Sequence, residues 1–325
     1  MTRIHKFKTL TAALALTVLA PLAAQAQAFP DKPITFVVPF AAGTATDQIA
    51  RALGNQVAAE SKQSVVIDNK AGASGFIASQ YVAKANPDGY TVLITTNTTH
   101  AANEHLYKKL PYDPVKDFAP VTGLGKGGQI MVVNPSFPAK SVMEFIAAAK
   151  KEPGKYSFGS GSSSSRMAGE LLQQMADIKL LHVPYKSNTL AVTDLLGGQI
   201  HMMITDTATG LPQVKGGKLR ALGMSSAARS PLAPDVPTIA EAGVKGYEMG
   251  YWFAAYAPAK TPPAVIKRLN ELLVKAARSE EARNAFYAPT GTEVFTTTPE
   301  EMASFQAAET QKWGRIVKGA GIEAE

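Results

Sequence analysis

Short apolar segments rich in β-branched residues alternate along the chain with segments whose apolar residues have helical spacing. The first run predicts strands at 34–40, 65–67 and 91–95, separated by helices at 47–60 and 75–84. Strands that alternate with helices in this way pack as a parallel sheet with helices on its faces. The sequence therefore predicts an α/β fold.

A second run of the same kind follows and leads into two C-terminal helices. Its expected elements, strands and helices together, are 130–133, 142–150, 156–159, 167–176, 180–183, 189–196, 201–204, 219–224, 253–257, 263–279 and 299–319. Glycine density rises near 123–128, and we expect a second crossing near 246–252. The pattern predicts two α/β lobes joined by two strand-like crossings: lobe 1 comprises 29–128 and 253–325, and lobe 2 comprises 129–252. The cleft between two such lobes is a preferred ligand site.

Residues 1–28 have the pattern of a secretory signal peptide and not of a folded segment. Arg3, Lys6 and Lys8 precede an apolar run of about 16 residues, and A-x-A sequences end at Ala26 and Ala28. The alternative is a membrane anchor, but a helix needs ~20 apolar residues to span a bilayer. We expect cleavage near Ala26 or Ala28, export to the periplasm, and a net charge that falls from +7 to about +4.

The composition excludes several classes of site. The chain has no cysteine, which excludes disulfides, thiol nucleophiles and cysteine metal ligands. The segment 123–128 matches G-x-G-x-x-G in letters, but it precedes a strand and does not open a helix, so we expect no dinucleotide cofactor. Basic residues are scattered, which argues against a nucleic-acid partner. We expect no cofactor and no metal.

One feature occurs twice: a strand, then a loop of small residues, then a helix. Small residues let a ligand approach the backbone closely, and a helix N-terminus carries unpaired N–H groups and about half a positive charge. Two such loops facing each other across a cleft would form two anion pockets, which suits a dicarboxylate. The alternative is two tight turns with N-capping Ser and Thr. The candidate residues are Phe40, Ala42, Gly43, Thr44, Ala45 and Thr46 in the first loop and Ser160, Ser162, Ser163 and Ser164 in the second.

Other polar residues follow strands that end at the same cleft. Thr96 and Asn97 end the strand at 91–95, and Asp206 follows the strand at 201–204. Arg166 directly follows the serine loop, where it can pair with a carboxylate. A capping role for Asp206 and a surface position for Arg166 are the alternatives. Candidate apolar walls, with core packing as the alternative, are Phe40, Tyr185 and Trp252.

A secreted serine hydrolase is the alternative function from another class. Its nucleophile would come from residues 160–165, with His182 and Asp206 as partners. However, the serine run lacks the closing glycine of the G-x-S-x-G motif. His182 lies within the apolar run 180–183, where we expect a structural histidine.

Ten blocks of sequence resemble the Bug family, the periplasmic solute receptors of tripartite tricarboxylate transporters. The likeness extends over essentially the whole mature chain. The blocks, in order, are 29–34, 38–43 with Asp47, 71–73, 86–91, 110–114, 182–186, 194–199, 217–221, 235–238 and 241–243.

The resemblance implies a two-lobed periplasmic-binding-protein (Venus flytrap) fold, which closes on a carboxylate and then docks on membrane permease subunits. By position, the ligand contacts are expected at 40–46 and 160–165. Thr44 stands where the family usually has glycine, Arg166 where it often has His or a small residue, and residues 187–188 (Ser-Asn) replace Gly-Gly. These polar groups favour an organic dianion, with aromatic dicarboxylates included. A sensor kinase is the alternative partner.

Overall fold

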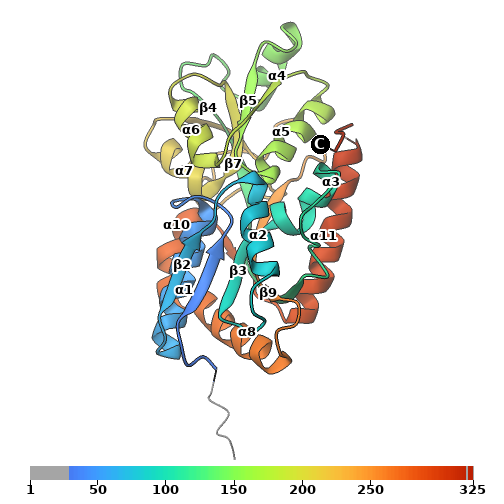
Figure 1. Ribbon diagram of the computed structural model, residues 1–325. Coiled ribbons are helices and arrows are strands. Elements are labelled where there is room, and N and C mark those ends of the chain that lie inside the picture. Colours follow the sequence, from blue (N-terminus) through green and yellow to red (C-terminus); the bar gives the residue numbers. More distant parts are fainter. Residues whose placement is uncertain (1–28, 320, 325) are drawn as a thin grey trace, which may run out of the picture.

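One long strand, β4 (Phe118–Val133), belongs to both parts of a ten-stranded sheet in the computed structural model (Figure 1). The structure describes residues 29–319 and 321–324, so the predicted signal peptide lies outside the described residues. Residues 118–128 of β4 pair antiparallel with β9 (Gly250–Pro258), whereas residues 129–133 pair antiparallel with β7 (Met202–Asp206). The strand order is β2-β1-β3-β9-β4-β7-β5-β6, and β8 and β10 also pair with β4. The sheet therefore has two halves joined by β4.

The first half contains three parallel strands, as the sequence predicts. Phe36 and Val38 point to one face and pack with Leu53 and Leu273, while Val37 points to the other face and packs with Ala78. Both faces are therefore buried by helices, as in other parallel sheets. The elements are β1 (Ile34–Val38), α1 (Ala45–Ser61), β2 (Val65–Asn69), α2 (Phe76–Ala83), β3 (Thr91–Thr96), α8 (Pro263–Ala277) and α11 (Pro299–Gly319).

The second half repeats this arrangement above the first in Figure 1. Its parallel strand β5 lies between β6 and β7. Ile130 packs with Leu195 and Leu211 on one face, and Met131 packs in the cluster of Phe145 on the other. The elements are α4 (Val142–Lys151), β5 (Ser157–Ser160), α5 (Ser163–Ala176), β6 (Leu181–Pro184), α6 (Asn188–Leu196), α7 (Thr207–Lys215) and β8 (Arg220–Met224).

The glycine-rich segment 123–128 is part of the continuous strand β4 and is not a loop between lobes. A side chain here would collide with its neighbours: a Cβ on Gly127 would lie 2.6 Å from the hydroxyl oxygen of Tyr251. The pairing partner of β4 changes between Gly128 and Gln129, which supports the division at that point. The division into 29–128 with 253–325 and 129–252 stays a prediction.

Several short helices have no counterpart in the predicted pattern. Helix α7 contains Gly210 and Pro212, and both residue types weaken a helical signal. The predicted loops are also shorter than expected, because α1 begins at Ala45 and α5 begins at Ser163. The remaining elements are η1 (Ala73–Gly75), η2 (Thr98–Ala102), α3 (Asn103–Leu106), α9 (Glu280–Ala282), η3 (Arg283–Tyr287), α10 (Ala288–Thr290) and β10 (Glu293–Val294).

Helix α11 has the bounds that the sequence predicts and lies along both halves (Figure 1). In the first half, the Gln306 side chain donates a 3.1 Å hydrogen bond to the carbonyl oxygen of Pro114. At the other end of the helix, the Gln174 side chain of α5 donates to the carbonyl oxygen of Gly319. The helix thus links the two halves on one side. No helix among the described residues combines the length and the apolar character needed to cross a membrane.

His100 is fully buried in the first half, on the η2 segment that follows β3. Its ring stacks on Tyr256 with 3.9 Å between ring centroids, and its Nδ1 is 2.8 Å from the Thr99 hydroxyl. Burial lowers the pKa of His100 to about 3 from an ordinary value of 6.5. The folded protein therefore holds a neutral imidazole at a pH where the unfolded chain carries a charged one.

This histidine predicts a loss of stability in mild acid. Because the folded-state pKa lies below the unfolded one, the free energy of unfolding should fall as pH drops below 6.5, by about 2 kcal/mol between pH 8 and pH 5. His100→Phe keeps the stack on Tyr256 and should remove this part of the pH dependence. Urea unfolding at each pH measures the free energy of unfolding for both proteins. Equal slopes for His100→Phe and wild type would contradict the prediction.

Candidate functional site

Four helices begin around one cavity between the two halves: α1 from the first half and α5, α6 and α7 from the second. Each is capped in the same way, by a side-chain oxygen that accepts a hydrogen bond from the third N–H of the helix. The caps are Thr44, Ser162, Ser187 and Asp206, with N···O distances of 3.4, 3.3, 3.3 and 2.8 Å.

This capping pattern leaves the first two N–H groups of each helix without an acceptor inside the helix. These N–H groups and the four helix dipoles favour an anion in the cavity, although the described residues that line it include no Lys, Arg or His and include Asp206. The space between atoms at this cavity amounts to about 410 Å³, part of it open to solvent. It is lined by Phe40, Thr44, Ala45, Thr46, Thr96, Gly161, Ser162, Ser164, Ser187, Asn188, Asp206, Tyr251 and Phe253. Such a site suits an anion.

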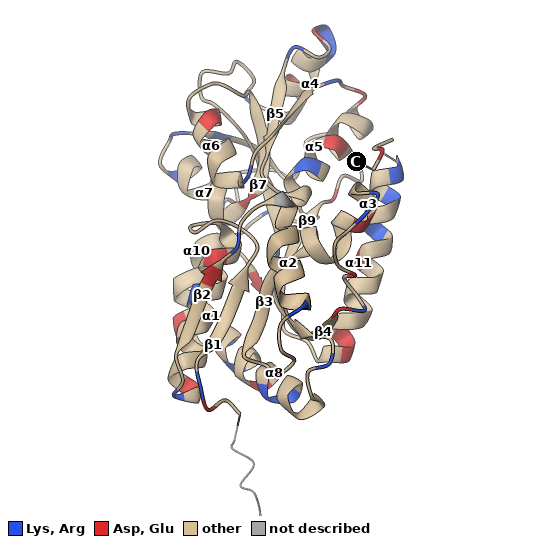
Figure 2. Cartoon of the chain, in the orientation of Figure 1, with Lys and Arg blue, Asp and Glu red and all other residues tan. Residues whose placement is uncertain are grey.

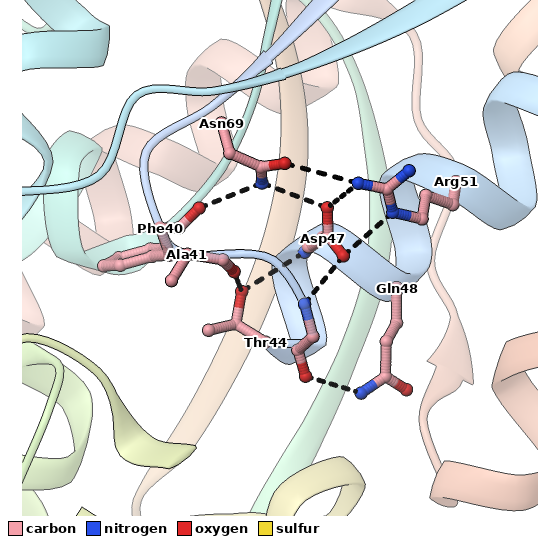
Figure 3. Close-up of polar contacts among 8 residues, drawn as sticks. Phe40, Ala41, Thr44, Asp47, Gln48, Arg51 and Asn69 are labelled. Atoms are coloured by element: carbon pink, nitrogen blue, oxygen red, sulfur yellow. Dashed lines mark hydrogen bonds and ion pairs between the residues drawn. The ribbon is translucent and has the colours of Figure 1, made fainter. Parts of the chain in front are cut away.

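Asp47 fixes the shape of the first loop (Figure 3). Its carboxylate accepts hydrogen bonds from the backbone N–H of Gly43 at 2.9 Å, from Asn69 Nδ2 at 3.0 Å and from Arg51 Nε at 3.0 Å. Asn69 Nδ2 also donates to the carbonyl oxygen of Phe40 at 3.0 Å. The loop from Phe40 to the start of α1 is therefore held at Gly43 by a buried carboxylate and at Phe40 by Asn69, which donates to the same carboxylate.

Asp47 remains ionised in this position. Burial alone would raise the pKa of Asp47, but hydrogen bonds from Arg51, Gly43 and Asn69 and the charge of Arg51 outweigh that effect and lower it below its ordinary value. The carboxylate is thus a constant acceptor for the loop at neutral pH.

In the second half, the side chain of Asn188 connects three helix starts. Its Oδ1 accepts from the backbone N–H of Gly161 at 3.0 Å, and its Nδ2 donates to Asp206 Oδ2 at 2.9 Å and lies 3.4 Å from the Ser162 hydroxyl. The backbones also touch: a Cβ on Gly161 would lie 1.8 Å from the carbonyl carbon of Ser187, so this position needs glycine. The starts of α5, α6 and α7 consequently form one connected wall.

The aromatic wall of the cavity comes from β9. Tyr251 and Phe253 line it, while Trp252, which points to the other face of the strand, donates from Nε1 to Glu309 on α11 at 3.2 Å. The Tyr251 hydroxyl lies 3.1 Å from Thr207 and 2.9 Å from Thr292, which belong to different halves. Trp252 is therefore not a wall of this cavity and packs in the core, which was the alternative given for it.

A second cavity adjoins the first and shares Phe40, Gly161 and Ser162 with it; the space between its atoms amounts to about 800 Å³, part of it open to solvent. It also lies between the halves. Its lining residues are Pro39, Phe40, Gly72, Ser74, Gly75, Leu106, Tyr107, residues 160–163, Arg166, His182, Pro184, Tyr185 and Lys186. Unlike the first cavity, it is lined by the basic side chains Arg166 and Lys186.

Twelve of the fifteen predicted binding residues line one cavity or both. Those in the first are Phe40, Thr44, Ala45, Thr46, Thr96, Ser162, Ser164 and Asp206, and those in the second are Phe40, Ser160, Ser162, Ser163, Arg166 and Tyr185. The other three, Ala42, Gly43 and Asn97, line neither. Ala42 and Gly43 are exposed at the tip of the first turn, and Asn97 is buried behind Thr96 with its side-chain amide toward the carbonyl oxygen of Gly250. Tyr185 directs its hydroxyl to Asp194 at 2.8 Å.

Gly161 lies within the expected contact range 160–165, but four other lining residues of the first cavity were not among the candidates: Ser187, Asn188, Tyr251 and Phe253. A signal existed for two of them, because Ser187 and Asn188 join a strand to a helix through small polar residues, as the two predicted loops do. Tyr251 and Phe253 alternate with Trp252, and the face that meets the cavity depends on how β9 pairs with β4.

In the alternative hydrolase triad, the serine and the histidine lie within hydrogen-bond distance of each other, whereas Asp206 has other partners. Ser160 Oγ lies 2.7 Å from His182 Nε2. Asp206 instead accepts from the N–H of Thr209, from Asn188 and, at 3.4 Å, from the Thr205 hydroxyl. Asp206 thus caps α7 and braces the wall of the cavity.

Charged residues are spread over helices of both halves and do not gather on one face of the view in Figure 2. Within the described chain, basic groups pair repeatedly with acidic neighbours, for example Arg229 with Glu241 at 2.8 Å and Lys275 with Glu60 at 2.7 Å.

Comparisons with known proteins agree with this geometry. The model of the family described as tripartite tricarboxylate transporter family receptor matches residues 49–322. Among solved structures, R. palustris Rpa4515 with adipate is 34% identical with a TM-score of 0.89, over 91% of this chain and 100% of that one. The periplasmic binding protein BugD is 32% identical with a TM-score of 0.87, over 91% and 100%.

A third similar structure is MatC (Rpa3494) from Rhodopseudomonas palustris with bound malate. It is 30% identical with a TM-score of 0.84, over 89% of this chain and 100% of that one. These similarities confirm the predicted resemblance to Bug proteins and the two-lobed α/β periplasmic-binding-protein fold.

Proposed function

The chain belongs to the tripartite tricarboxylate transporter receptor family, and we propose that it captures a small organic dicarboxylate between its two halves and delivers it to the membrane permease of such a transporter. The protein acts by binding and carries out no reaction on its ligand. Aromatic dicarboxylates belong to the proposed ligand class. Its place of action is the periplasm, after cleavage of the signal peptide near Ala26 or Ala28.

One observation carries this proposal: four capped helix starts meet at a single cavity whose walls come from both halves. A carboxylate there would take hydrogen bonds from free first-turn N–H groups and hydroxyls without a buried counter-ion. Two similar proteins, at 34% and 30% identity, have adipate and malate, which are both dicarboxylates. The same class of ligand is therefore the best supported for this chain.

Capture and delivery follow from the position of the cavity. A ligand that contacts α1 in the first half and α5 in the second makes its full set of contacts only when the halves are closed. It therefore shifts the population toward the closed form by its differential affinity. The permease would recognise the closed form and accept the ligand from it.

Calorimetry with a panel of carboxylates tests the proposal. The panel contains acetate, succinate, adipate, malate, terephthalate and citrate, and adipamide serves as the uncharged counterpart of adipate. We expect at least one dicarboxylate to bind, and adipamide to bind at least about 100-fold more weakly than adipate where adipate binds, because the amide cannot supply an anion to the helix starts. Absence of binding by every acid to a folded sample would contradict the proposed function.

A further inference from the structure

We propose that the second cavity is the subsite for the distal carboxylate of the ligand, and that Arg166 is the residue that recognises it. This inference rests on the proposed function. It specifies the ligand as a diacid whose two charges are separated by a spacer long enough to pass from one cavity to the next. The first carboxylate occupies the cavity of helix starts, and the second meets the basic side chains of the neighbouring cavity.

The two cavities are continuous in their lining. Phe40, Gly161 and Ser162 contribute to both, so a molecule seated against the start of α5 passes the Phe40 ring and the Gly161 backbone on its way to the second cavity. Gly161 has no side chain to separate the two cavities. Its backbone N–H donates a 3.0 Å hydrogen bond to Asn188 Oδ1, which fixes its position. An apolar spacer would pack on Phe40, which belongs to the other half.

The two cavities offer a diacid different groups. The described lining of the first includes no basic side chain and one acidic residue, Asp206, so a carboxylate there depends on helix N–H groups and hydroxyls, whereas the lining of the second includes Arg166 and Lys186 and no Asp or Glu. Arg166 stands one turn into α5, four residues after the cap Ser162, so its position relative to the first carboxylate site is set by the helix. A guanidinium binds a carboxylate through two parallel hydrogen bonds, which makes Arg166 sensitive to the position of the second charge.

The environment of Arg166 favours this role over that of a freely moving surface charge. Its side chain is only 22% exposed, and its Nε lies 3.9 Å from Glu170 Oε1 on the next turn. This ion pair with Glu170 restrains the arginine along the helix. Lys186 is exposed and adds attraction that salt can screen.

Binding of paired acids tests the inference. Each diacid is compared with the monoacid of the same skeleton: succinate with butyrate, adipate with hexanoate, and terephthalate with benzoate. In at least one pair, we expect the wild type to bind the diacid more tightly than it binds the monoacid. In Arg166→Gln that diacid should lose about 10- to 100-fold in affinity, whereas its monoacid should change by less than about 3-fold. Arg166→Lys should recover part of the loss.

Two further variants keep the test decisive if Arg166→Gln lowers stability. Lys186→Gln changes an exposed side chain, and we expect it to weaken the diacid about 2- to 5-fold, with an effect that shrinks at high salt. Lys150→Gln, an equal change of charge on the exposed part of α4, should leave both acids unchanged. Two results would overturn the inference while leaving carboxylate binding intact. One is an equal loss of affinity for the diacid and its monoacid in Arg166→Gln, and the other is unchanged diacid affinity in both Arg166→Gln and Lys186→Gln. Failure of the wild type to bind any of the six acids would overturn both.

Discussion

Replacing Ser164 by Glu should abolish ligand binding and leave the fold intact. Ser164 is the second residue of α5, is 6% exposed and lines the first cavity. A carboxylate at this helix position is favourable to the helix by about 0.3–1 kcal/mol, so the variant should unfold at the wild-type temperature or above it. Inside the cavity, the same carboxylate repels the ligand by about 4 kcal/mol at 4 Å with an effective dielectric constant near 20.

Calorimetry with the tightest-binding dicarboxylate measures this effect, and we expect a loss of at least about 100-fold in affinity. Met143→Glu is the matched control, because Met143 is the second residue of α4 in the same half and is exposed away from the cavity lining. It should leave the affinity unchanged. Wild-type affinity in Ser164→Glu would mean that the ligand does not occupy the cavity of helix starts.

Replacing Asp47 by Ala should cause the largest loss of stability expected from a single polar side chain in the site. The change leaves Gly43, Asn69 and Arg51 without their shared acceptor (Figure 3). Removal of one partner from a buried charged network costs about 3–5 kcal/mol, and because Arg51 is half exposed we expect about 3 kcal/mol.

Urea unfolding gives the free energy of Asp47→Ala directly. Asp68→Ala is the control: Asp68 pairs with Lys70 at 3.0 Å near the surface, and we expect its removal to cost less than about 1 kcal/mol. The loop that begins at Phe40 should also lose its fixed shape in Asp47→Ala, which lowers ligand affinity at least about 10-fold. A loss of stability equal to that of Asp68→Ala would show that the carboxylate does not hold the loop.

The sequence predicted the alternation of strands and helices because each element has its own local pattern. Helix α11 has the predicted bounds, Pro299–Gly319, since proline at its start and an apolar stripe along it are both local signals. The bounds of β4 could not be predicted, because its glycines resemble a hinge. These glycines are needed because side chains distant in sequence pack against them, as Tyr251 does against Gly127.

The site was predictable to the extent that it is made of strand-to-helix turns. Residues 40, 44–46 and 160–164 of the two predicted loops line the cavities because the carboxyl ends of parallel strands meet at one edge of each half-sheet. Asn188 was not among the predicted residues although its turn has the same pattern, and its function as a brace between three helix starts depends on the packing of α5, α6 and α7. Tyr251 and Phe253 depend on the register of β9 against β4, which no local pattern contains.

The most direct test of carboxylate capture at the four helix starts is a crystal structure of the protein with the dicarboxylate that binds most tightly. We expect one carboxylate in the first cavity, within hydrogen-bond distance of first-turn N–H groups of α1 and α5, and the other toward Arg166. A ligand bound in the groove beside β4 and β9 that is lined by Lys126, Arg229 and Lys312, with the first cavity unoccupied, would contradict it.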